Sequence, residues 1–271
     1  MNPWLLAPPV VLTGLAGLTA YGAVNARSQL FGPTLYQTDS AKRLALTFDD
    51  GPNPAITPKL LDILDRYNAK ATFFVVGNFV RECPGLVKDT AACGHVIGNH
   101  THTHPNLFFC GPAETREELQ RCNDAISHAT WEQPRWFRPP FGFRSPWLGE
   151  IVHQHSLRTV MWTLLPGDWR AKPVVWLIPR LQPIADHLQR NSAMGSLANG
   201  IREGTASAVP KSATNRGVLT PEAGSHGDIL CLHDGDYTQL NGDRSRTLAA
   251  LEHWLPRWSD LGLEFVTMNQ L

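Results

Sequence analysis

The sequence has no excess of charge of either sign. Its 24 Lys plus Arg residues offset 24 Asp plus Glu residues, and charged residues make up only 18% of the chain. Because a basic surplus is the electrostatic basis for binding nucleic acid, we expect no nucleic-acid partner. Hydrophobic residues account for 42% of the sequence. This share excludes a chain that is disordered throughout.

Cysteine is scarce, and its number is odd. The five cysteines include no Cys-x-x-Cys pair. The count is too low for a disulfide scaffold, and a monomer keeps at least one free thiol. Two interpretations stay open: a bridge from Cys122 to Cys83 or Cys110 in an exported protein, or five small buried side chains.

Charge is also absent from the N-terminal segment, where residues 3–24 are apolar and uncharged. This length is close to the roughly 20 residues that span a bilayer. Small residues follow at 24–26, so a cleaved signal peptide is the competing interpretation. No Lys or Arg precedes the run, whereas Arg27 follows it, which weakly favours a cytoplasmic body. We expect residues 1–26 to be an anchor or signal and residues 27–42 to be a linker.

Beyond this segment, short apolar runs alternate with stretches of helical periodicity. Strands are predicted over residues 43–48, 71–76, 94–98, 136–138, 158–163, 228–232 and 263–267. Strands that alternate with helices are typical of parallel βαβ units, open or closed into a barrel. Residues 191–227 break this alternation and are rich in small and polar residues. We expect a long flexible loop there.

Two adjacent carboxylates, Asp49 and Asp50, follow the first predicted strand within the run Thr47–Pro52. Loops at the carboxyl ends of barrel strands build active sites. Neighbouring carboxylates repel each other, so a cation or a shared proton is expected nearby. The same residues also form ordinary turns, so this motif alone leaves the function open.

Three histidines occur within five residues, at positions 100, 102 and 104. On a helical turn, His100 and His104 face the same side and can bind one metal, whereas His102 points elsewhere. Asp50 would complete a His-His-Asp set. Such a set leaves coordination positions for water and substrate, as catalytic metal sites do.

These residues resemble the first two motifs of a known family, the NodB-like polysaccharide deacetylases of carbohydrate esterase family four. Three further motifs follow in the family's order: Arg138–Gly142 resembles the third, Asp168-Trp169 the fourth and Leu230–Asp234 the fifth. Five ordered motifs are far more specific than any one of them. The resemblance implies an α/β fold, a distorted (β/α) barrel with about seven parallel strands, in a domain spanning residues 43–271.

The resemblance also implies a reaction and a cofactor. The family hydrolyses N-acetyl groups on an N-acetylglucosamine-containing glycan, such as peptidoglycan, a chitin-type oligomer or an exopolysaccharide. A divalent metal, zinc or else Co or Ni, would be held by Asp50, His100 and His104. The metal would polarise the acetyl carbonyl and activate water.

The remaining roles follow from the same resemblance. Asp49 would be the general base, oriented by Arg138, and His233 the general acid, oriented by Asp168. Substrate binding is implied at Phe141, through its backbone N–H, at Trp169 and at Leu232.

Phe141 and Cys231 are among the positions that depart from the family pattern. Phe141 stands where members often have Tyr, and Cys231 stands where an apolar residue of the acetyl-methyl pocket is common. The residues implied for proton transfer and metal binding are all present.

Two other functions stay open at this point: a deacylase or amide hydrolase for a small non-sugar substrate, and a non-catalytic carbohydrate-binding homologue. An exposed Trp169 in an open cleft would favour the glycan. Because glycan substrates usually lie outside the cytoplasm, we expect a membrane-anchored or exported monomer whose catalytic domain is extracytoplasmic, against the weak charge bias.

Overall fold

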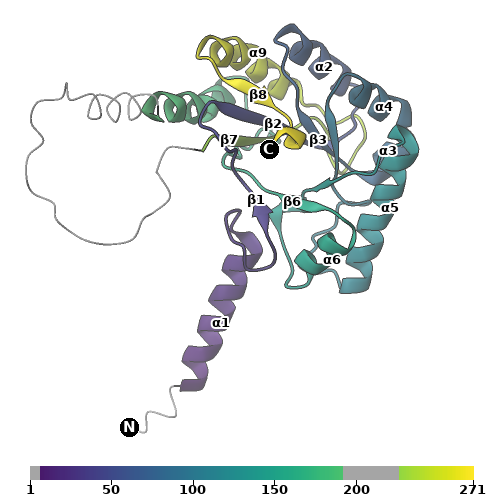
Figure 1. The fold of residues 1–271 in the computed structure, drawn as a ribbon, viewed down its shortest axis with the longest axis vertical. Coiled ribbons are helices and arrows are strands. Elements are labelled where there is room, and N and C mark those ends of the chain that lie inside the picture. The colour runs from purple at the N-terminus through teal and green to yellow at the C-terminus, as the bar shows by residue number, and fades with distance from the viewer. Residues whose placement is uncertain (1–6, 192–225) are drawn as a thin grey trace, which may run out of the picture.

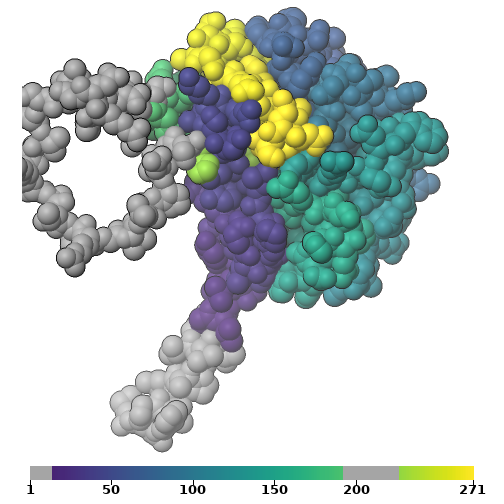
Figure 2. Space-filling view, viewed as in Figure 1, coloured from purple at the N-terminus to yellow at the C-terminus, as the bar shows by residue number. Residues whose placement is uncertain are grey.

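The structure is a computed structural model that describes residues 7–191 and 226–271, with side chains from residue 14 onward. These residues form a rounded body of strands and helices, from which the N-terminal helix α1 (Ala7–Val24) projects (Figures 1 and 2). The flexible loop expected over residues 191–227 falls almost entirely outside the described residues.

A parallel sheet forms the centre of this body. In the described part of the chain its strands lie in the order β1-β6-β5-β4-β3-β2-β7, and β8 pairs with the first half of β2. Residues 27–42, expected to be a linker, contribute β1 to the sheet. The strands are β1 (Thr34–Leu35), β2 (Arg43–Gly51), β3 (Thr72–Val75), β4 (Val96–Asn99), β5 (Trp136–Phe137), β6 (Arg158–Val160), β7 (Asp228–His233) and β8 (Glu264–Val266).

The sheet curls until its two sides meet. The chain that follows β6 runs along β7, where the Thr163 N–H donates to the Ile229 carbonyl and the Cys231 N–H donates to the Leu164 carbonyl, each at 3.0 Å. These bonds close a distorted barrel. The predicted α/β barrel with seven parallel strands along its main path is therefore confirmed, with β8 added beside β2.

Helices cover the outer face of the barrel (Figure 1). Side chains alternate between the two faces of a strand. Leu44, Leu46 and Phe48 of β2 therefore pack against the helices, while Ala45 packs with other strands inside the barrel. Burial of each such large apolar side chain contributes about 1.5–3 kcal/mol. The helices are α2 (Thr57–Arg66), α3 (Gly77–Glu82), α4 (Pro84–Ala92), α5 (Pro112–Thr130), α6 (Leu148–Gln154), α7 (Val174–Leu177), a helical stretch over 182–191, and α9 (Ser245–Asp260).

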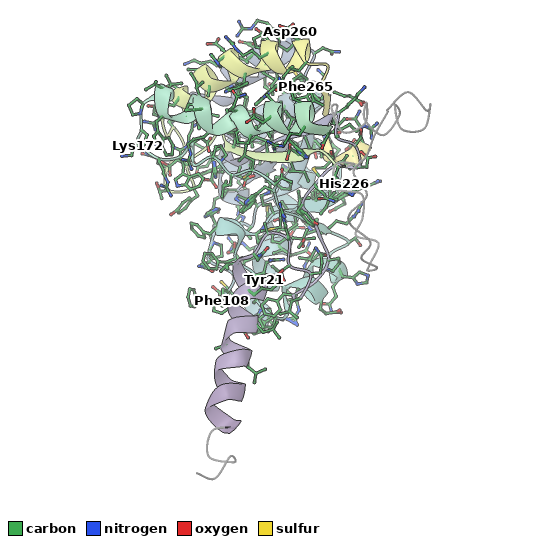
Figure 3. The ribbon with its side chains drawn as sticks, turned by 90° about the vertical axis from the view of Figure 1, so that its left-hand side faces the viewer. Tyr21, Phe108, Lys172, His226, Asp260 and Phe265 are labelled. Carbon is green, nitrogen blue, oxygen red and sulfur yellow. The ribbon has the colours of Figure 1, made fainter. Side chains whose placement is uncertain are left out.

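Helix α1 extends away from the barrel in two perpendicular views (Figures 1 and 3). Its side chains Leu15, Leu18 and Tyr21 are each about half exposed. The end of the helix is nevertheless fastened to the barrel, because the buried Arg144 guanidinium donates to the carbonyls of Asn25 and Ser28. None of the helices in the described ranges has the length and apolar character needed to cross a bilayer.

Candidate active site

Both carboxylates at the end of β2 lie in one pocket because the strand is irregular there. The predicted strand ended at Phe48, but the observed strand continues to Gly51. In a regular strand, neighbouring side chains point to opposite faces. Here the register with β3 shifts between Asp49 and Gly51, and Asp50 adopts a left-handed φ of 69°. This bulge turns Asp49 and Asp50 toward the same side of the sheet.

The histidine-bearing segment lies at the carboxyl end of β4, and it is a loop. The helical turn expected for His100 and His104 is wrong, because Thr101 and His104 have φ values of 66° and 62°. Buried Glu118 of α5 holds the loop by accepting the His102 and Thr103 N–H groups at 2.9 and 2.7 Å. A fixed loop with left-handed residues thus replaces the helical turn.

The loop brings two imidazoles onto Asp50. The Nε2 atoms of His100 and His104 lie 3.4 and 3.2 Å from Asp50 Oδ1. Among the described residues, this buried oxygen has no hydrogen-bond partner. His102 lies in the same loop with its ring outside this cluster, as expected.

The cluster has the chemistry of a divalent metal site. One donor atom from each of Asp50, His100 and His104 lies within 4.8 Å of the others. His100 Nδ1 lies 2.7 Å from the Arg138 carbonyl, which fixes that nitrogen as the donor and leaves Nε2 free to bind a cation. Burial lowers the pKa of His104, which keeps this ring neutral. Burial also opposes ionisation of Asp50, but the adjacent imidazoles outweigh it and hold the pKa of Asp50 below its ordinary value.

Asp49 is held by a different set of partners. Arg138 Nη1 donates to Asp49 Oδ1 at 2.8 Å and to Thr47 Oγ1 at 2.7 Å. The other guanidinium nitrogens of Arg138, which is fully buried, donate to two backbone carbonyls. Burial, followed by the neighbouring Asp49 charge, raises the pKa of the Cys231 thiol, which donates to Asp49 Oδ2 at 3.2 Å. Arg138 therefore fixes Asp49 through Oδ1, while Oδ2 accepts from the Cys231 thiol.

The buried Arg138–Asp49 pair should make a large contribution to stability. Arg138→Ala leaves a buried carboxylate without its cation, and breaking such a pair costs about 3–5 kcal/mol. Urea unfolding should show this loss, whereas Arg116→Ala, on an exposed part of α5, should stay within about 0.5 kcal/mol of wild type. Equal unfolding midpoints for the two variants would show that the pair is not a structural support.

His233 lies opposite Asp49 on the neighbouring strand β7, where the two are register partners. Its Nδ1 is 2.9 Å from Asp168 Oδ1, and its backbone N–H donates to Asp168 Oδ2 at 2.8 Å. Thr247 also donates to Asp168. Burial alone would lower the pKa of His233, but the Asp168 carboxylate outweighs burial and raises it to about 9. The Asp168 carboxylate thus favours the charged form of this imidazole.

These side chains line one pocket of about 470 Å³ at the carboxyl ends of the strands. Its rim carries Phe141, with 48% of its surface exposed, and Trp169, with 39%. Phe141 has a left-handed φ of 57°. Leu232 does not line the pocket, because strand alternation turns it into the core between sheet and helices, while Cys231 and His233 face the pocket.

Comparison with known proteins places this arrangement in a family. Residues 36–160 match the family model for polysaccharide deacetylase. The chain is 32% identical over 244 residues to a peptidoglycan-N-acetylglucosamine deacetylase of Bacillus cereus, covering 88% of this chain and 94% of the relative. The chain belongs to the polysaccharide deacetylase family.

Two further similarities support this membership. A chitooligosaccharide deacetylase of Sinorhizobium fredii is 39% identical over 236 residues, which cover 85% of this chain and 92% of the relative. A crystal structure of a peptidoglycan N-acetylglucosamine deacetylase, in complex with an N-oxidanyl-benzamide compound, is similar with a TM-score of 0.66 at 26% identity. That match covers 88% of this chain and 91% of the other.

In this polysaccharide deacetylase, sequence reasoning missed two aromatic residues of the pocket. Tyr237 stacks on His104, with ring centroids 4.2 Å apart, and is 41% exposed. Trp162, which lies within the predicted apolar strand over residues 158–163, is only partly buried and lines the pocket. Tyr237 lies four residues after His233, in the loop that follows β7. A search of the loops at strand carboxyl ends could therefore have found it.

Proposed function

We propose that this chain is a metal-dependent N-deacetylase that hydrolyses N-acetyl groups of an N-acetylglucosamine-containing glycan. The observation that carries the proposal is that Asp49 and His233 face one pocket as register partners, beside the cluster of Asp50, His100 and His104. A carboxylate base, a charged imidazole acid and a cation site are groups that can together carry out metal-dependent amide hydrolysis. The names of the relatives support the same activity.

Asp50, His100 and His104 would hold the divalent metal. We propose zinc, since two imidazoles and a carboxylate suit it, with Co or Ni as substitutes. A bound cation supplies Lewis acidity toward the acetyl carbonyl and toward water.

The proton transfers fall to the chain's own residues. Arg138 occupies Asp49 Oδ1, so Oδ2 is the atom that takes the proton of the attacking water. Asp168 occupies Nδ1 of His233, so Nε2 is the atom that protonates the leaving amine. The Phe141 backbone N–H is proposed to donate to the developing oxyanion.

Exposed aromatic rings favour a glycan over a small non-sugar amide. Phe141, Trp169 and Tyr237 are each about 40–50% exposed, and all three line the pocket. Such rings supply flat apolar faces on which a sugar ring can rest. We expect kcat/KM for N-acetylglucosamine oligomers to exceed that for small acetamides by at least about 100-fold. Equal values would refute a glycan substrate.

The pH dependence should report on His233. The charged form of His233 is the proposed acid, and its pKa is about 9. Activity should therefore fall as the pH rises through the pKa of His233. A bound cation lowers this pKa, so the alkaline limb should lie at or below about pH 9. Asp168→Asn removes the negative charge that supports the imidazolium. The alkaline limb should then move about one to three pH units toward lower pH.

Thr247→Val is the matched control for this shift. It removes one hydrogen bond to Asp168 and keeps the carboxylate charge, so the limb should stay close to wild type. A rate–pH profile measured on one glycan decides the matter. An alkaline limb that is identical in Asp168→Asn and wild type would show that His233, supported by Asp168, is not the general acid.

We also propose that the segment before residue 27 is retained as an anchor and that the catalytic barrel is extracytoplasmic. Cleavage after Ala26 would remove the Asn25 carbonyl that the buried Arg144 guanidinium binds. Unsatisfied buried charge is costly, so the barrel favours an intact segment. Mass spectrometry should find the uncut chain in the membrane fraction. A chain that begins at residue 27 or later would show that the segment is a cleaved signal.

A further inference from the structure

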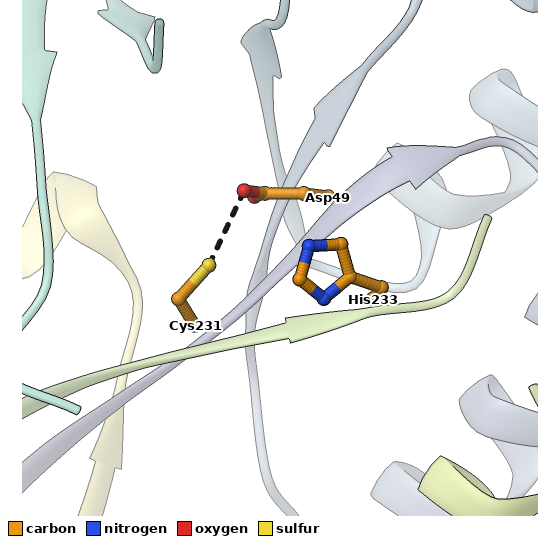
Figure 4. Close-up of side chains that lie close together, drawn as sticks. All are labelled: Asp49, Cys231 and His233. Carbon is orange, nitrogen blue, oxygen red and sulfur yellow. Dashed lines mark hydrogen bonds between the residues drawn. The ribbon is translucent and has the colours of Figure 1, made fainter. Parts of the chain in front are cut away.

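A second set of metal-ligating atoms lies beside the cluster of Asp50, His100 and His104. Asp49, Cys231 and His233 each offer one donor, a carboxylate oxygen, a thiol sulfur and a ring nitrogen, and these atoms lie within 4.8 Å of one another. Figure 4 shows the three side chains converging from β2 and β7. We propose that they form a second cation site, for zinc or for a softer divalent ion such as cadmium, and that its occupation inhibits the enzyme.

Strand register builds this site. Thr47 pairs with Cys231 and Asp49 with His233 across β2 and β7, so both β7 side chains face the pocket. The sulfur already contacts the carboxylate, because Cys231 Sγ donates to Asp49 Oδ2 at 3.2 Å. A cation would take the place of the thiol proton and of the proton on His233 Nε2, and both protons would pass to solvent, since coordinating thiols and imidazole nitrogens are deprotonated.

The neighbours leave the required donor atoms free. Arg138 binds Asp49 Oδ1, which leaves Oδ2 for a cation. Asp168 binds His233 Nδ1, which leaves Nε2. A carboxylate on the second nitrogen of a histidine is the usual support of a metal ligand. Sulfur, nitrogen and oxygen together favour zinc and softer ions over magnesium or calcium.

Nearby positive charge should make this site the weaker of the two. Arg138 lies 2.8 Å from Asp49, and His100 of the first cluster lies 3.8 Å from it. A cation in the first cluster repels a second one at such short range. The second site should therefore fill only in metal excess. Binding of the second ion does not depend on the proposed function. Inhibition by this ion does rest on it, because the ion would occupy the proposed base and the proposed acid.

Cadmium titration of the full chain, loaded with one zinc, tests the site. Bound metal per chain is measured by equilibrium dialysis, and thiolate binding by the ultraviolet thiolate-to-cadmium absorption. Wild type should bind a second ion with this absorption. Cys231→Ser should keep the first ion, lose the absorption and bind the second more than about 100-fold more weakly, since even supporting residues contribute about 10–100-fold.

Two more variants separate the site from general thiol binding. Cys93→Ser removes an exposed thiol and should leave the absorption unchanged. Asp168→Asn should keep the absorption while weakening the second ion about 10–100-fold. Absorption that persists in Cys231→Ser, or that disappears in Cys93→Ser, would overturn the site.

Acetate release measured in the same titration separates the two proposals. It should fall in wild type as the absorption appears, and the fall should require more cadmium in Cys231→Ser. Thiolate-to-cadmium absorption that appears without any fall in acetate release would overturn the proposed inhibition. A one-zinc protein that releases no acetate would instead refute the proposed function, and the binding result would still decide the second site.

Discussion

Asp49→Asn should lower acetate release from an N-acetylated glycan by about 10²–10⁴-fold, the usual effect of losing a positioned base. An amide cannot take the proton of the attacking water. Its oxygen can still accept the Arg138 hydrogen bond, so the fold should persist with lower stability, since the buried Arg138 loses its opposite charge. Metal content should not change, because Asp50, His100 and His104 are intact. Initial rates and zinc analysis on the same preparation give both results.

Asp124→Asn on α5 is the control for this variant, since it removes an exposed carboxylate outside the pocket. It should keep the wild-type rate. An Asp49→Asn protein with a near-wild-type rate would contradict the base assignment. Loss of zinc from that protein would instead show that Asp49 binds the metal and that the roles of Asp49 and Asp50 are exchanged.

His104→Ala should remove the metal and, with it, the activity. The variant deletes one of the three proposed ligands, Asp50, His100 and His104, so zinc affinity should fall by more than about 100-fold. Acetate release should drop to the level of chelator-treated wild type. Zinc titration by calorimetry or dialysis measures the first effect, and the glycan assay measures the second.

His102→Ala is the matched control, because His102 lies in the same loop, is equally buried and stays outside the cluster. It should retain one zinc even if it unfolds at lower urea concentration. Unchanged zinc stoichiometry in His104→Ala would refute the Asp-His-His site.

Much of this site could be predicted because ordered motifs name residue types that the chemistry needs. Five of the residues predicted for metal binding and proton transfer line one pocket, and two others hold members of this set in place. Arg138 contacts Asp49, and Asp168 contacts His233. The five that line the pocket are Asp49, Asp50, His100, His104 and His233. The alternation of strands and helices predicted parallel βαβ units, and the family resemblance implied that they form a distorted barrel. These features follow from local periodicity and from residue identity, which the sequence contains directly.

The local backbone could not be predicted in the same way. In a regular strand, the side chains of Asp49 and Asp50 would point to opposite faces of the sheet. Only the shifted register with β3 turns both toward the pocket. The histidine loop depends on left-handed residues and on Glu118, which comes from α5. Such features arise from tertiary contacts between distant segments, and no spacing in the sequence encodes them.

Leu232 and Trp162 illustrate a second reason. A motif match assigned Leu232 to substrate binding, whereas strand alternation buries it in the core and exposes Cys231 to the pocket. Trp162 follows β6, where the chain turns along β7 to close the barrel. Its position therefore depends on barrel closure, which local periodicity does not describe.

The products formed from an N-acetylglucosamine oligomer test the central claim. Acetate and new primary amine should appear in equal amounts with wild type. Both should cease after chelation and return when zinc is added back, while Asp49→Asn stays inactive with zinc bound. Acetate without amine, or release that continues in chelator and in Asp49→Asn, would contradict metal-dependent N-deacetylation at this site.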